Sequence, residues 1–268
     1  MPDLWTSVAK LDSNTQERLA GVLETRGADP QQQAIRRAFL TGIRFPERAR
    51  VLEVGCGTGV LTRMLVKCPG VAEVVGVDAA PALLDRARAL AAGLPDTSFQ
   101  EADAHSLPFE AGSFDAVVFD SVLCHLVDPE RALDEARRVL RSHGCLAIID
   151  GDYATTTIAL EDFDPLQLCA DANMFTAVHD RWFARRLPSL VRKTGFEIVE
   201  FRSHGYATIA DGYMTTVLER GVDLLEGRGT IGTELARALK AEGRRRIEAG
   251  SFFGHIAYAS LTARRSIP

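Results

Sequence analysis

The sequence predicts a doubly wound α/β fold, in which helices cover both faces of a mostly parallel sheet. Three observations predict this fold class: short apolar runs recur along the chain, their apolar residues are nearly continuous, and helical patterns separate them. Continuous apolar runs are typical of strands that are buried on both faces of a parallel sheet. Alternation of strands and helices over residues 50–150 therefore places the core of the fold there.

Four apolar runs are the predicted strands of this core. They are residues 51–54, 74–77, 114–119 and 146–149. Between them, residues 81–92 are rich in Ala, Leu and Arg, and Asp128 followed by Pro129 is typical of an N-cap with proline at the first helical position. Right-handed crossovers then put the loops that follow the strands along one edge of the sheet, where ligands bind in this fold class.

The flanking segments are mostly helical. Helices are predicted over residues 12–41, with a restart at Asp29-Pro30, and over 164–178, 180–193 and 211–249. Two late strands are predicted over 196–201 and 251–263, the second rich in aromatic and β-branched residues. Because two strands do not suit an independent domain, we expect one domain over 1–268. It comprises an N-terminal helical cap (1–45), a ligand-binding core (46–155) and a part that completes the sheet and carries helical lid insertions (156–268).

Composition indicates the class of protein. The chain has 31 basic and 36 acidic residues, a formal net charge of −5. This balance argues against nucleic-acid binding, because a protein that binds the phosphate backbone normally carries a positive excess. No apolar run approaches the ~20 residues that span a bilayer, and the first residues lack the blocks of a signal peptide. Five cysteines without a C-x-x-C pair fit a reducing compartment and indicate no metal site. We therefore expect a cytoplasmic protein without a membrane anchor.

The most informative stretch is residues 51–59, in which a predicted strand leads into glycines at alternate positions. Glycine is needed where a ligand lies against the backbone, because a Cβ would occupy that space. A helical pattern begins near Val60, and a helix N-terminus offers free N–H groups. The second strand ends at Asp78, whose carboxylate can accept hydrogen bonds from both hydroxyls of a ribose. A dinucleotide fingerprint would place its third glycine at Val60, so the G-x-G-x-G spacing disfavours a pyrophosphate cofactor.

Residues 53–59 resemble the first motif of class I S-adenosylmethionine-dependent methyltransferases. Further segments resemble later motifs in order: Asp78 the ribose-binding acid, 102–104 the adenine segment, and 114–118 with 122–126 the fourth-strand motif. The chain is most similar to the ubiquinone/menaquinone-biosynthesis type, which often carries two histidines in the last stretch; here the first of them is Cys124. The resemblance is strong over about residues 45–150. It implies a Rossmann-like, seven-stranded sheet that is mostly parallel with the last strand antiparallel, and S-adenosyl-L-methionine as cofactor.

The resemblance assigns ten residues to the cofactor site: Glu53, Gly55, Cys56, Gly57, Gly59, Asp78, Ala79, Asp103, Ala104 and Ser121. The glycine backbone passes the methionine part of the cofactor, Asp78 takes the ribose, and Asp103 with Ala104 takes the adenine. Ser121 lies where the amino-acid end should be. Glu53 either braces the loop or contacts the amino group of the cofactor, and the alternative for Asp103 is a turn cap.

Methyl transfer requires that nucleophile and methyl group are held in line, and oxygen or nitrogen nucleophiles can also need a base. His125 is the base candidate, because it follows a strand on the ligand-binding edge and imidazole titrates in the useful range. Its alternative is a structural histidine packed beneath the cofactor. Asp152 and Tyr153 follow the fifth strand on the same edge, where they could bind or deprotonate substrate. Asp152 could equally be a solvated loop carboxylate.

The sequence thus predicts a methyltransferase that moves a methyl group to O, N or C of a small aromatic or apolar metabolite. Aromatic residues of the added segments either line an apolar pocket or fill the core of the cap; they are Phe175, Trp182, Phe183, Tyr206, Tyr213, Phe252 and Phe253. Two other functions stay open: a cyclase or rearrangement enzyme that binds S-adenosylmethionine without transferring methyl, and a nucleotide- or nicotinamide-binding module. The expected partner is a small-molecule substrate, with no nucleic acid, no membrane and no metal; the pattern is compatible with a monomer or a dimer.

Overall fold

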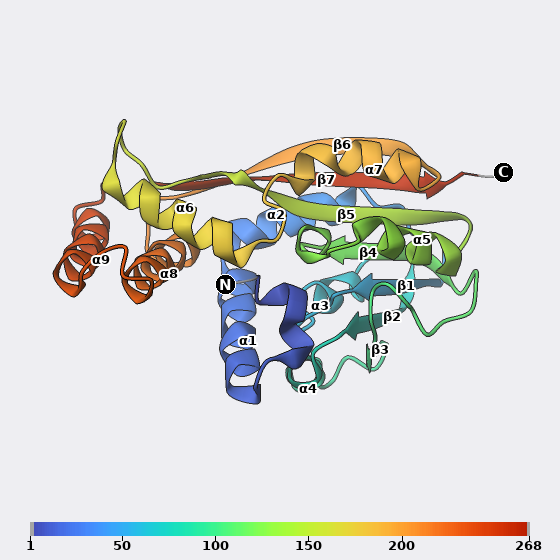
Figure 1. Cartoon of the computed structure of the whole chain (residues 1–268). Coiled ribbons are helices and arrows are strands. Elements are labelled where there is room, and N and C mark those ends of the chain that lie inside the picture. The colour runs from blue at the N-terminus through green and yellow to red at the C-terminus, as the bar shows by residue number, and fades with distance from the viewer. Residues whose placement is uncertain (1–2, 267–268) are drawn as a thin grey trace.

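The computed structural model describes residues 3–266 and shows one seven-stranded sheet in the order β3-β2-β1-β4-β5-β7-β6 (Figure 1). The strands are β1 (Ala49–Val54), β2 (Val71–Asp78), β3 (Thr97–Glu101), β4 (Phe114–Asp120), β5 (Leu140–Thr157), β6 (Phe196–Thr208) and β7 (Gly254–Arg265). The first five are parallel, and β7 is antiparallel to both β5 and β6. The predicted fold class is confirmed.

The central strands owe their position to continuous apolar sequence. Val51 and Leu52 of β1 and Val117 of β4 have no exposed surface, as expected for strands covered on both faces. β3 was not predicted, because its residues Thr-Ser-Phe-Gln-Glu are mostly polar and lie at the edge of the sheet. Edge strands tolerate such residues because one side of the strand faces solvent.

Eleven helical segments flank the strands within the described residues. They are η1 (Trp5–Lys10), α1 (Ser13–Ala28), α2 (Pro30–Thr41), α3 (Thr62–Leu65), α4 (Pro81–Leu90), η2 (Leu123–His125), α5 (Pro129–Val139), α6 (Pro165–Ala177), α7 (Phe183–Lys193), α8 (Tyr213–Gly227) and α9 (Thr233–Glu248). Asp12, Asp29 and Asp128 each cap a helix through a side-chain oxygen. The helix expected to begin near Val60 starts at Thr62 and lasts a single turn, because residues 57–61 form turns.

Helices α6, α8 and α9 form a lobe beyond one end of the sheet, where the long strands β5, β6 and β7 extend past the parallel strands (Figure 1). We call this unit the α6–α8–α9 lobe. Its helices are in close contact: a Cβ at Gly221 of α8 would lie 1.7 Å from the carbonyl oxygen of Cys169 in α6. Only glycine therefore allows these two helices to approach so closely.

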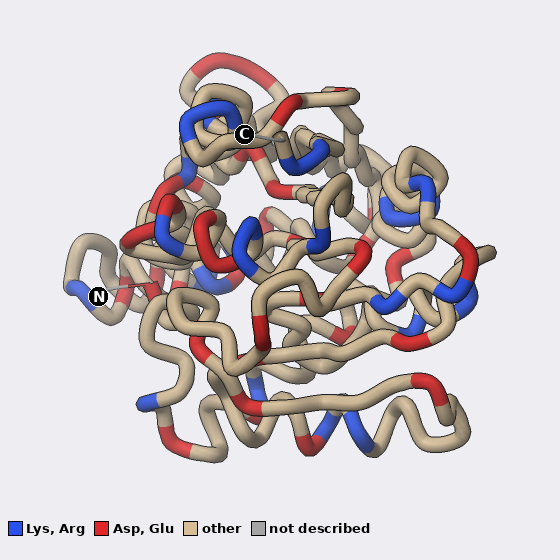
Figure 2. The backbone as a smooth tube through the Cα atoms, turned by 90° about the vertical axis from the view of Figure 1, so that its right-hand side faces the viewer, with Lys and Arg blue, Asp and Glu red and all other residues tan. Residues whose placement is uncertain are grey.

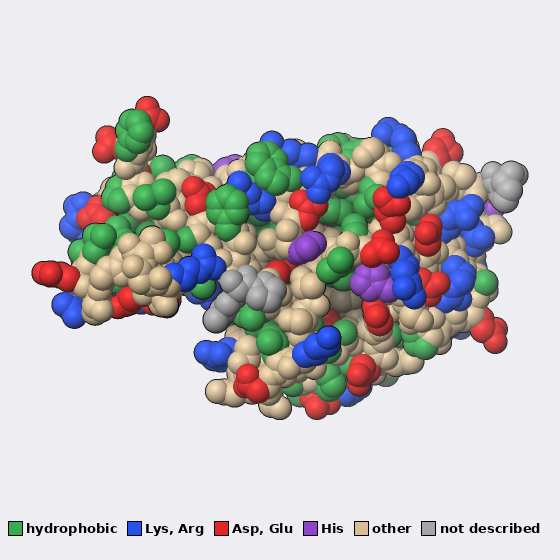
Figure 3. Space-filling model, viewed as in Figure 1, with side chains coloured by type: hydrophobic (Ala, Val, Ile, Leu, Met, Phe, Trp, Pro, Cys, Tyr) green, Lys and Arg blue, Asp and Glu red, His purple; other side chains and the backbone are tan. Residues whose placement is uncertain are grey.

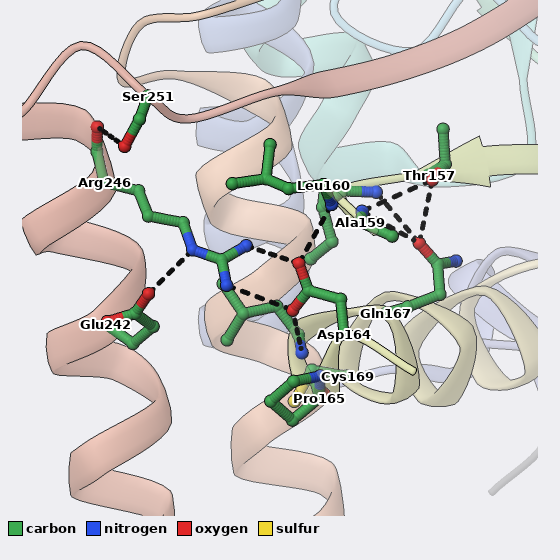
Figure 4. Close-up of polar contacts among 12 residues, drawn as sticks. Thr157, Ala159, Leu160, Asp164, Pro165, Gln167, Cys169, Glu242, Arg246 and Ser251 are labelled. Carbon is green, nitrogen blue, oxygen red and sulfur yellow. Dashed lines mark hydrogen bonds and ion pairs between the residues drawn. The ribbon is translucent and has the colours of Figure 1, made fainter. Parts of the chain in front are cut away.

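A buried ion pair fastens α9 to the start of α6 (Figure 4). Asp164 accepts hydrogen bonds from Arg246 Nη1 at 2.6 Å and from the backbone N–H groups of Leu160 and Leu166. Burial alone would raise the pKa of Asp164, but these hydrogen bonds outweigh it and hold the pKa below its ordinary value. Arg246 also donates to Glu242 at 2.8 Å, so both ends of the guanidinium are held.

The surface carries mixed charges and a few exposed apolar side chains. Acidic and basic residues are interspersed along the backbone in the view of Figure 2. Hydrophobic side chains gather over the outer side of α6 and the segment before α7 (Figure 3), where Leu168, Phe175 and Trp182 are exposed. Among residues 3–266, each helix is too short or too polar to cross a bilayer.

Candidate functional site

A cavity of about 830 Å³ lies at the carboxyl ends of β1, β2 and β4, between the sheet and the α6–α8–α9 lobe. Its size falls in the range of small-ligand sites, about 300–1,000 Å³. One end is lined by the glycine loop and by residues after β2 and β3, and the other by residues of α6 and α8. Segments from four parts of the chain therefore meet at the edge of the sheet where ligands were expected.

The glycine loop is shaped by its own backbone and by neighbouring side chains. Gly55 and Gly57 have φ angles of 70° and 53°, a region that favours glycine. A Cβ at Gly55 would lie 2.5 Å from Val122, and one at Gly57 would lie 2.7 Å from Leu23. Both glycines line the cavity, but Gly59 does not: its Cβ position faces Phe99, 3.0 Å away. Contact with a ligand alone, as expected from the sequence, does not explain the glycines.

Asp78 is joined directly to the glycine loop. One carboxylate oxygen accepts the N–H of Gly57 at 2.8 Å, and the other accepts the N–H of Ala80 at 2.9 Å. Burial raises the pKa of Asp78 although both hydrogen bonds oppose the shift. Each oxygen keeps a second lone pair, so the carboxylate can still accept hydrogen bonds from a ligand in the cavity. Ala79 lines the cavity beside it.

Asp103 and Ala104 both line the cavity, and Asp103 also caps a turn. Its Oδ1 accepts the backbone N–H of His105 at 2.9 Å and lies 2.7 Å from the ring Nδ1 of the same residue. Partial burial would raise the pKa of Asp103, but the hydrogen bonds from His105 outweigh it and lower the pKa. Since 66% of the side chain is exposed, the cap leaves part of the carboxylate open to a ligand.

Glu53 lies under the loop and is 2% exposed. The Thr62 hydroxyl donates a hydrogen bond to its carboxylate, which ties β1 to the first residue of α3. Burial raises the pKa of Glu53 from 4.5 to about 8, and the negative charges of Asp120 and Asp78 act in the same direction. The carboxyl group is therefore mostly protonated at neutral pH, and it also lines the cavity.

Two buried arginines on the N-terminal helices were not predicted as site residues. Arg36 Nε donates to Asp120 at 2.6 Å, and Arg26 Nη2 donates to Ser121 Oγ at 2.7 Å. Among the described residues, Arg26 Nε and Arg36 Nη1 are buried without a hydrogen-bond partner. Two guanidinium groups face one carboxylate here, so this part of the cavity has an excess positive charge and free donors for an anion.

Ser121 itself has a φ of 57°, an unusual backbone conformation for a residue other than glycine. Its hydroxyl donates to Asp120 at 3.0 Å while it accepts from Arg26. The residue therefore lies at the carboxyl end of β4, inside the cavity, as the sequence predicted.

His125 lines the cavity and is held by a residue that the sequence analysis missed, Asp3. His125 Nδ1 lies 2.6 Å from Asp3 Oδ2, and the backbone N–H of His179 donates to the same oxygen at 2.9 Å. An imidazole that donates from Nδ1 to a carboxylate presents an unprotonated Nε2 when it is neutral. Thr6 donates to the His125 carbonyl at 2.8 Å, so the N-terminal segment fixes both the ring and the backbone of this residue.

The structure separates Asp152 from Tyr153. Tyr153 is buried, lines the cavity, and its ring centroid lies 6.4 Å from that of His125. Burial raises the pKa of Tyr153 well above its ordinary value. Asp152 does not line the cavity and instead accepts a hydrogen bond from Arg185 at 2.8 Å. Successive side chains of a strand point to opposite faces, which explains why only one of the two reaches the site.

The aromatic residues named from the sequence outside the core of the fold also differ in whether they reach the cavity. Phe183, Tyr206 and Phe252 are buried in the core, whereas Phe175 and Trp182 are exposed. Of the seven aromatic residues named from the sequence, Tyr213 lines the cavity. The wall on the lobe side is therefore built mainly from smaller residues of α6 and α8.

Comparisons with known proteins match the part of the chain that carries the glycine loop, Asp78 and Asp103. Residues 52–148 match the family model described as "Methyltransferase domain". A demethylmenaquinone methyltransferase of Thermus thermophilus is 46% identical over 104 residues, which cover 38% of this chain and 46% of the relative. A 2-phytyl-1,4-naphtoquinone methyltransferase of Thermosynechococcus vestitus is 36% identical over 122 residues, 45% of this chain and 54% of the relative. Over residues 52–148 the chain is therefore similar to methyltransferase domains. It spans about half the length of the curated relatives it matches.

Solved structures show the same fold over most of the chain. A putative methyltransferase from Bacillus halodurans has a TM-score of 0.62 at 21% identity and covers 87% of this chain and 99% of its own. The [4+2]-cyclase SpnF has a TM-score of 0.60 at 22% identity and covers 100% of this chain and 98% of its own.

The matched part of the methyltransferase domain ends before the substrate side of the cavity. Asp3, Arg26 and Arg36 precede residues 52–148, and the α6–α8–α9 lobe follows them. Asp3, Arg26 and Arg36 belong to no local sequence motif. They reach the site because segments that are distant in the sequence pack together. The sequence offered at most a weak signal, a helical pattern over residues 12–41 with arginines at positions 26 and 36.

Proposed function

We propose that the chain binds S-adenosylmethionine in this cavity and transfers its methyl group to O, N or C of a small, largely apolar metabolite. The observation that carries the proposal is the direct link between Gly57 and Asp78, which fixes the loop and the acid in one unit at the mouth of a cavity that continues to the lobe. His125 and Tyr153 line the same cavity, so they would be available to an acceptor bound beside an adenosyl group at this unit.

The residues present fit the cofactor in charge and in hydrogen bonding. Asp78 would accept from the ribose hydroxyls, and Asp103 with Ala104 would hold the adenine. Arg26 and Arg36 would hold the carboxylate, because their buried free N–H groups need an acceptor. Glu53, Gly55, Cys56, Ala79 and Ser121 complete the lining, whereas Gly59 shapes the loop without facing the ligand.

When bound, S-adenosylmethionine supplies a methyl group on a good leaving group, so the protein has mainly to orient and to exclude water. Trp5 of η1 and Leu23 of α1 line the cavity and would help to exclude water from it. For an oxygen or nitrogen nucleophile, Nε2 of His125 would take the proton, and Asp3 would stabilise the imidazolium that forms. Tyr153 would position the acceptor; Asp152, outside the cavity, has no role in this step.

The test is incubation of the protein with methyl-labelled S-adenosylmethionine and a panel of phenols, amines and enols. Label in the product supports methyl transfer, and product without label indicates a cyclase or rearrangement enzyme. Calorimetry with S-adenosylhomocysteine and with NAD tests the site itself. Binding of NAD in place of S-adenosylhomocysteine would overturn the proposal.

We further propose a small molecule, and no nucleic acid or membrane, as the partner, since the net charge is −5 and charges of both signs are interspersed. Five free cysteines support a reducing, cytoplasmic setting. We also propose one domain over 1–268, in which the lobe would serve as the lid of the cofactor-binding core.

A further inference from the structure

The wall that the α6–α8–α9 lobe gives to the cavity has a defined chemistry. Its residues are Asn173, Met174 and Ala177 of α6, Val178, and Tyr213, Thr216, Val217 and Arg220 of α8. The four α8 residues follow the spacing i, i+3, i+4, i+7, so they share one face of the helix. Arg220 therefore belongs to the cavity face of α8 and not to its solvent face.

The charges on this wall are one-sided. Arg220 is its single ionised residue, and no carboxylate on the described parts of α6 or α8 lines the cavity. The anionic lining residues Asp78, Glu101, Asp103 and Asp120 lie at or just after the carboxyl ends of strands, and Asp120 is paired with Arg36. A ligand that fills the cavity thus meets acidic groups beside the sheet and, on the lobe wall, a cation without a carboxylate partner.

Arg220 also has no partner within residues 3–266: neither a hydrogen bond nor an ion pair joins it to another side chain. Three other arginines of the lobe are paired, Arg228 with Thr176, Arg244 with Glu219 and Arg246 with Asp164, whereas Arg237 on α9 is exposed to solvent. Burial lowers the pKa of Arg220, which shows that its environment disfavours the charge.

A second polar side chain on the wall is also unpartnered. Asn173 is 5% exposed, and its amide makes no hydrogen bond with a described residue. Both groups line the cavity with their donors free, so they favour a ligand group that accepts hydrogen bonds.

We propose that the substrate is an anion: an apolar body that ends in a carboxylate or phosphate, with Arg220 and Asn173 holding the anionic group. This inference rests on the proposed function, since it takes the lobe side of the cavity as the acceptor site. Arg220 lies seven residues from Tyr213, about 10 Å along α8 at 1.5 Å per residue. Binding of the anionic group on this wall would orient the acceptor for in-line transfer.

The test uses matched probes on the protein saturated with S-adenosylhomocysteine. The probes are 4-phenylbutyrate, 4-phenylbutyl phosphate and the neutral isostere 4-phenylbutanamide, with dissociation constants measured by NMR titration. The wild type should bind one or both anions about tenfold more tightly than the amide, since a charge-assisted hydrogen bond is roughly worth that ratio. The ratio between the two anions distinguishes a carboxylate site from a phosphate site.

Arg220→Met should abolish the preference for anions, and Arg220→Lys should retain part of it. The matched control is Arg18→Met, which removes an exposed cation that acts electrostatically on Arg220 but lies outside the cavity. The control should keep the wild-type preference. Equal binding of anion and amide by the wild type, or equal loss of preference in both variants, would overturn the inference. Failure of S-adenosylhomocysteine to bind at all would instead refute the proposed function, which keeps the two failures distinct.

Discussion

Replacing Glu53 with glutamine should remove a pH dependence from the stability of the protein. Glu53 is 2% exposed, and burial raises its pKa from 4.5 to about 8, helped by the charges of Asp120 and Asp78. The unfolded chain has no such environment, so the carboxyl group there ionises near its ordinary pKa. The folded state consequently holds the proton more tightly than the unfolded state does.

The sign and size of the effect follow from this difference in pKa. The contribution of a group with a raised folded-state pKa is complete below the unfolded pKa and is lost as pH rises through the folded pKa. One unit of pKa corresponds to about 1.4 kcal/mol, so the wild type should lose about 3 kcal/mol of unfolding free energy from this group between pH 4.5 and 7. Glutamine stays neutral and can still accept the hydrogen bond from Thr62, so Glu53→Gln should lose none of it.

The assay is urea unfolding of the wild type and Glu53→Gln at intervals from pH 5 to pH 8. The difference between the two unfolding free energies should grow in favour of the variant as pH rises. Glu17→Gln is the control, because Glu17 lies exposed on α1. Parallel pH curves for the wild type and Glu53→Gln would refute the reasoning, since the buried carboxyl group would then not titrate differently in the two states.

The same residue separates the two roles that the sequence left open for it. A cofactor ammonium group beside Glu53 would favour its ionised form, so binding at pH 7 would release a proton from the carboxyl group. A carboxyl group that only braces the loop would keep its proton. Calorimetry of S-adenosylhomocysteine binding in two buffers of different ionisation enthalpy, for the wild type and Glu53→Gln, measures that release.

Three other predictions test neighbouring parts of the structure. Asp78→Ala should weaken S-adenosylhomocysteine binding by about 1–3 kcal/mol in calorimetry, because hydrogen bonds to the ligand and to Gly57 are lost. The control Asp85→Ala, at an exposed position on α4, should leave the affinity unchanged. Unchanged affinity of Asp78→Ala would remove the ribose assignment. Asp3→Asn should reduce the population of the Nδ1-protonated tautomer of His125, which the ¹⁵N resonances of the ring report. The same variant should lower kcat and leave cofactor affinity unchanged. An unchanged tautomer population would mean that Asp3 does not orient the ring. Arg246→Met should lower the unfolding free energy, measured in urea, by about 2–4 kcal/mol, because Asp164 is left buried without its cation. Adding Asp164→Asn to this variant should restore part of the loss. A change below about 0.5 kcal/mol, the size of an ordinary surface substitution, would show that the pair does not stabilise the lobe.

Much of the sheet could be predicted because strands buried on both faces leave a strong local signal. The apolar runs at 51–54 and 114–119, the capping Asp before a proline, and the loop that leads to Asp78 are all features of neighbouring residues. β3 escaped prediction because an edge strand needs no apolar run. The start and the short length of α3 were not predicted, because the turns at the glycines after β1 determine where the helix begins.

The site was predictable only where a motif encodes it. Asp3, Arg26 and Arg220 lie on segments far apart in the sequence, and their meeting depends on how those segments pack. The separation of Asp152 from Tyr153, by contrast, could have been predicted from the alternation of side chains along a strand. With the strand extended by four residues beyond 149, only one of these two neighbours can face the cavity.

The two halves of the cavity therefore differ in how far the comparisons with known proteins describe them. The half that Glu53, Asp78 and Asp103 line falls within residues 52–148, where the chain matches other methyltransferases. The half that Asp3, Arg26 and Arg220 line falls outside that match, so a relative's named substrate says little about it. Since the lobe wall carries a cation and no described carboxylate, its chemistry favours an anionic acceptor over a neutral quinol. A search for the substrate should accordingly begin with acids and phosphates that have an apolar body, with the neutral quinols as the comparison.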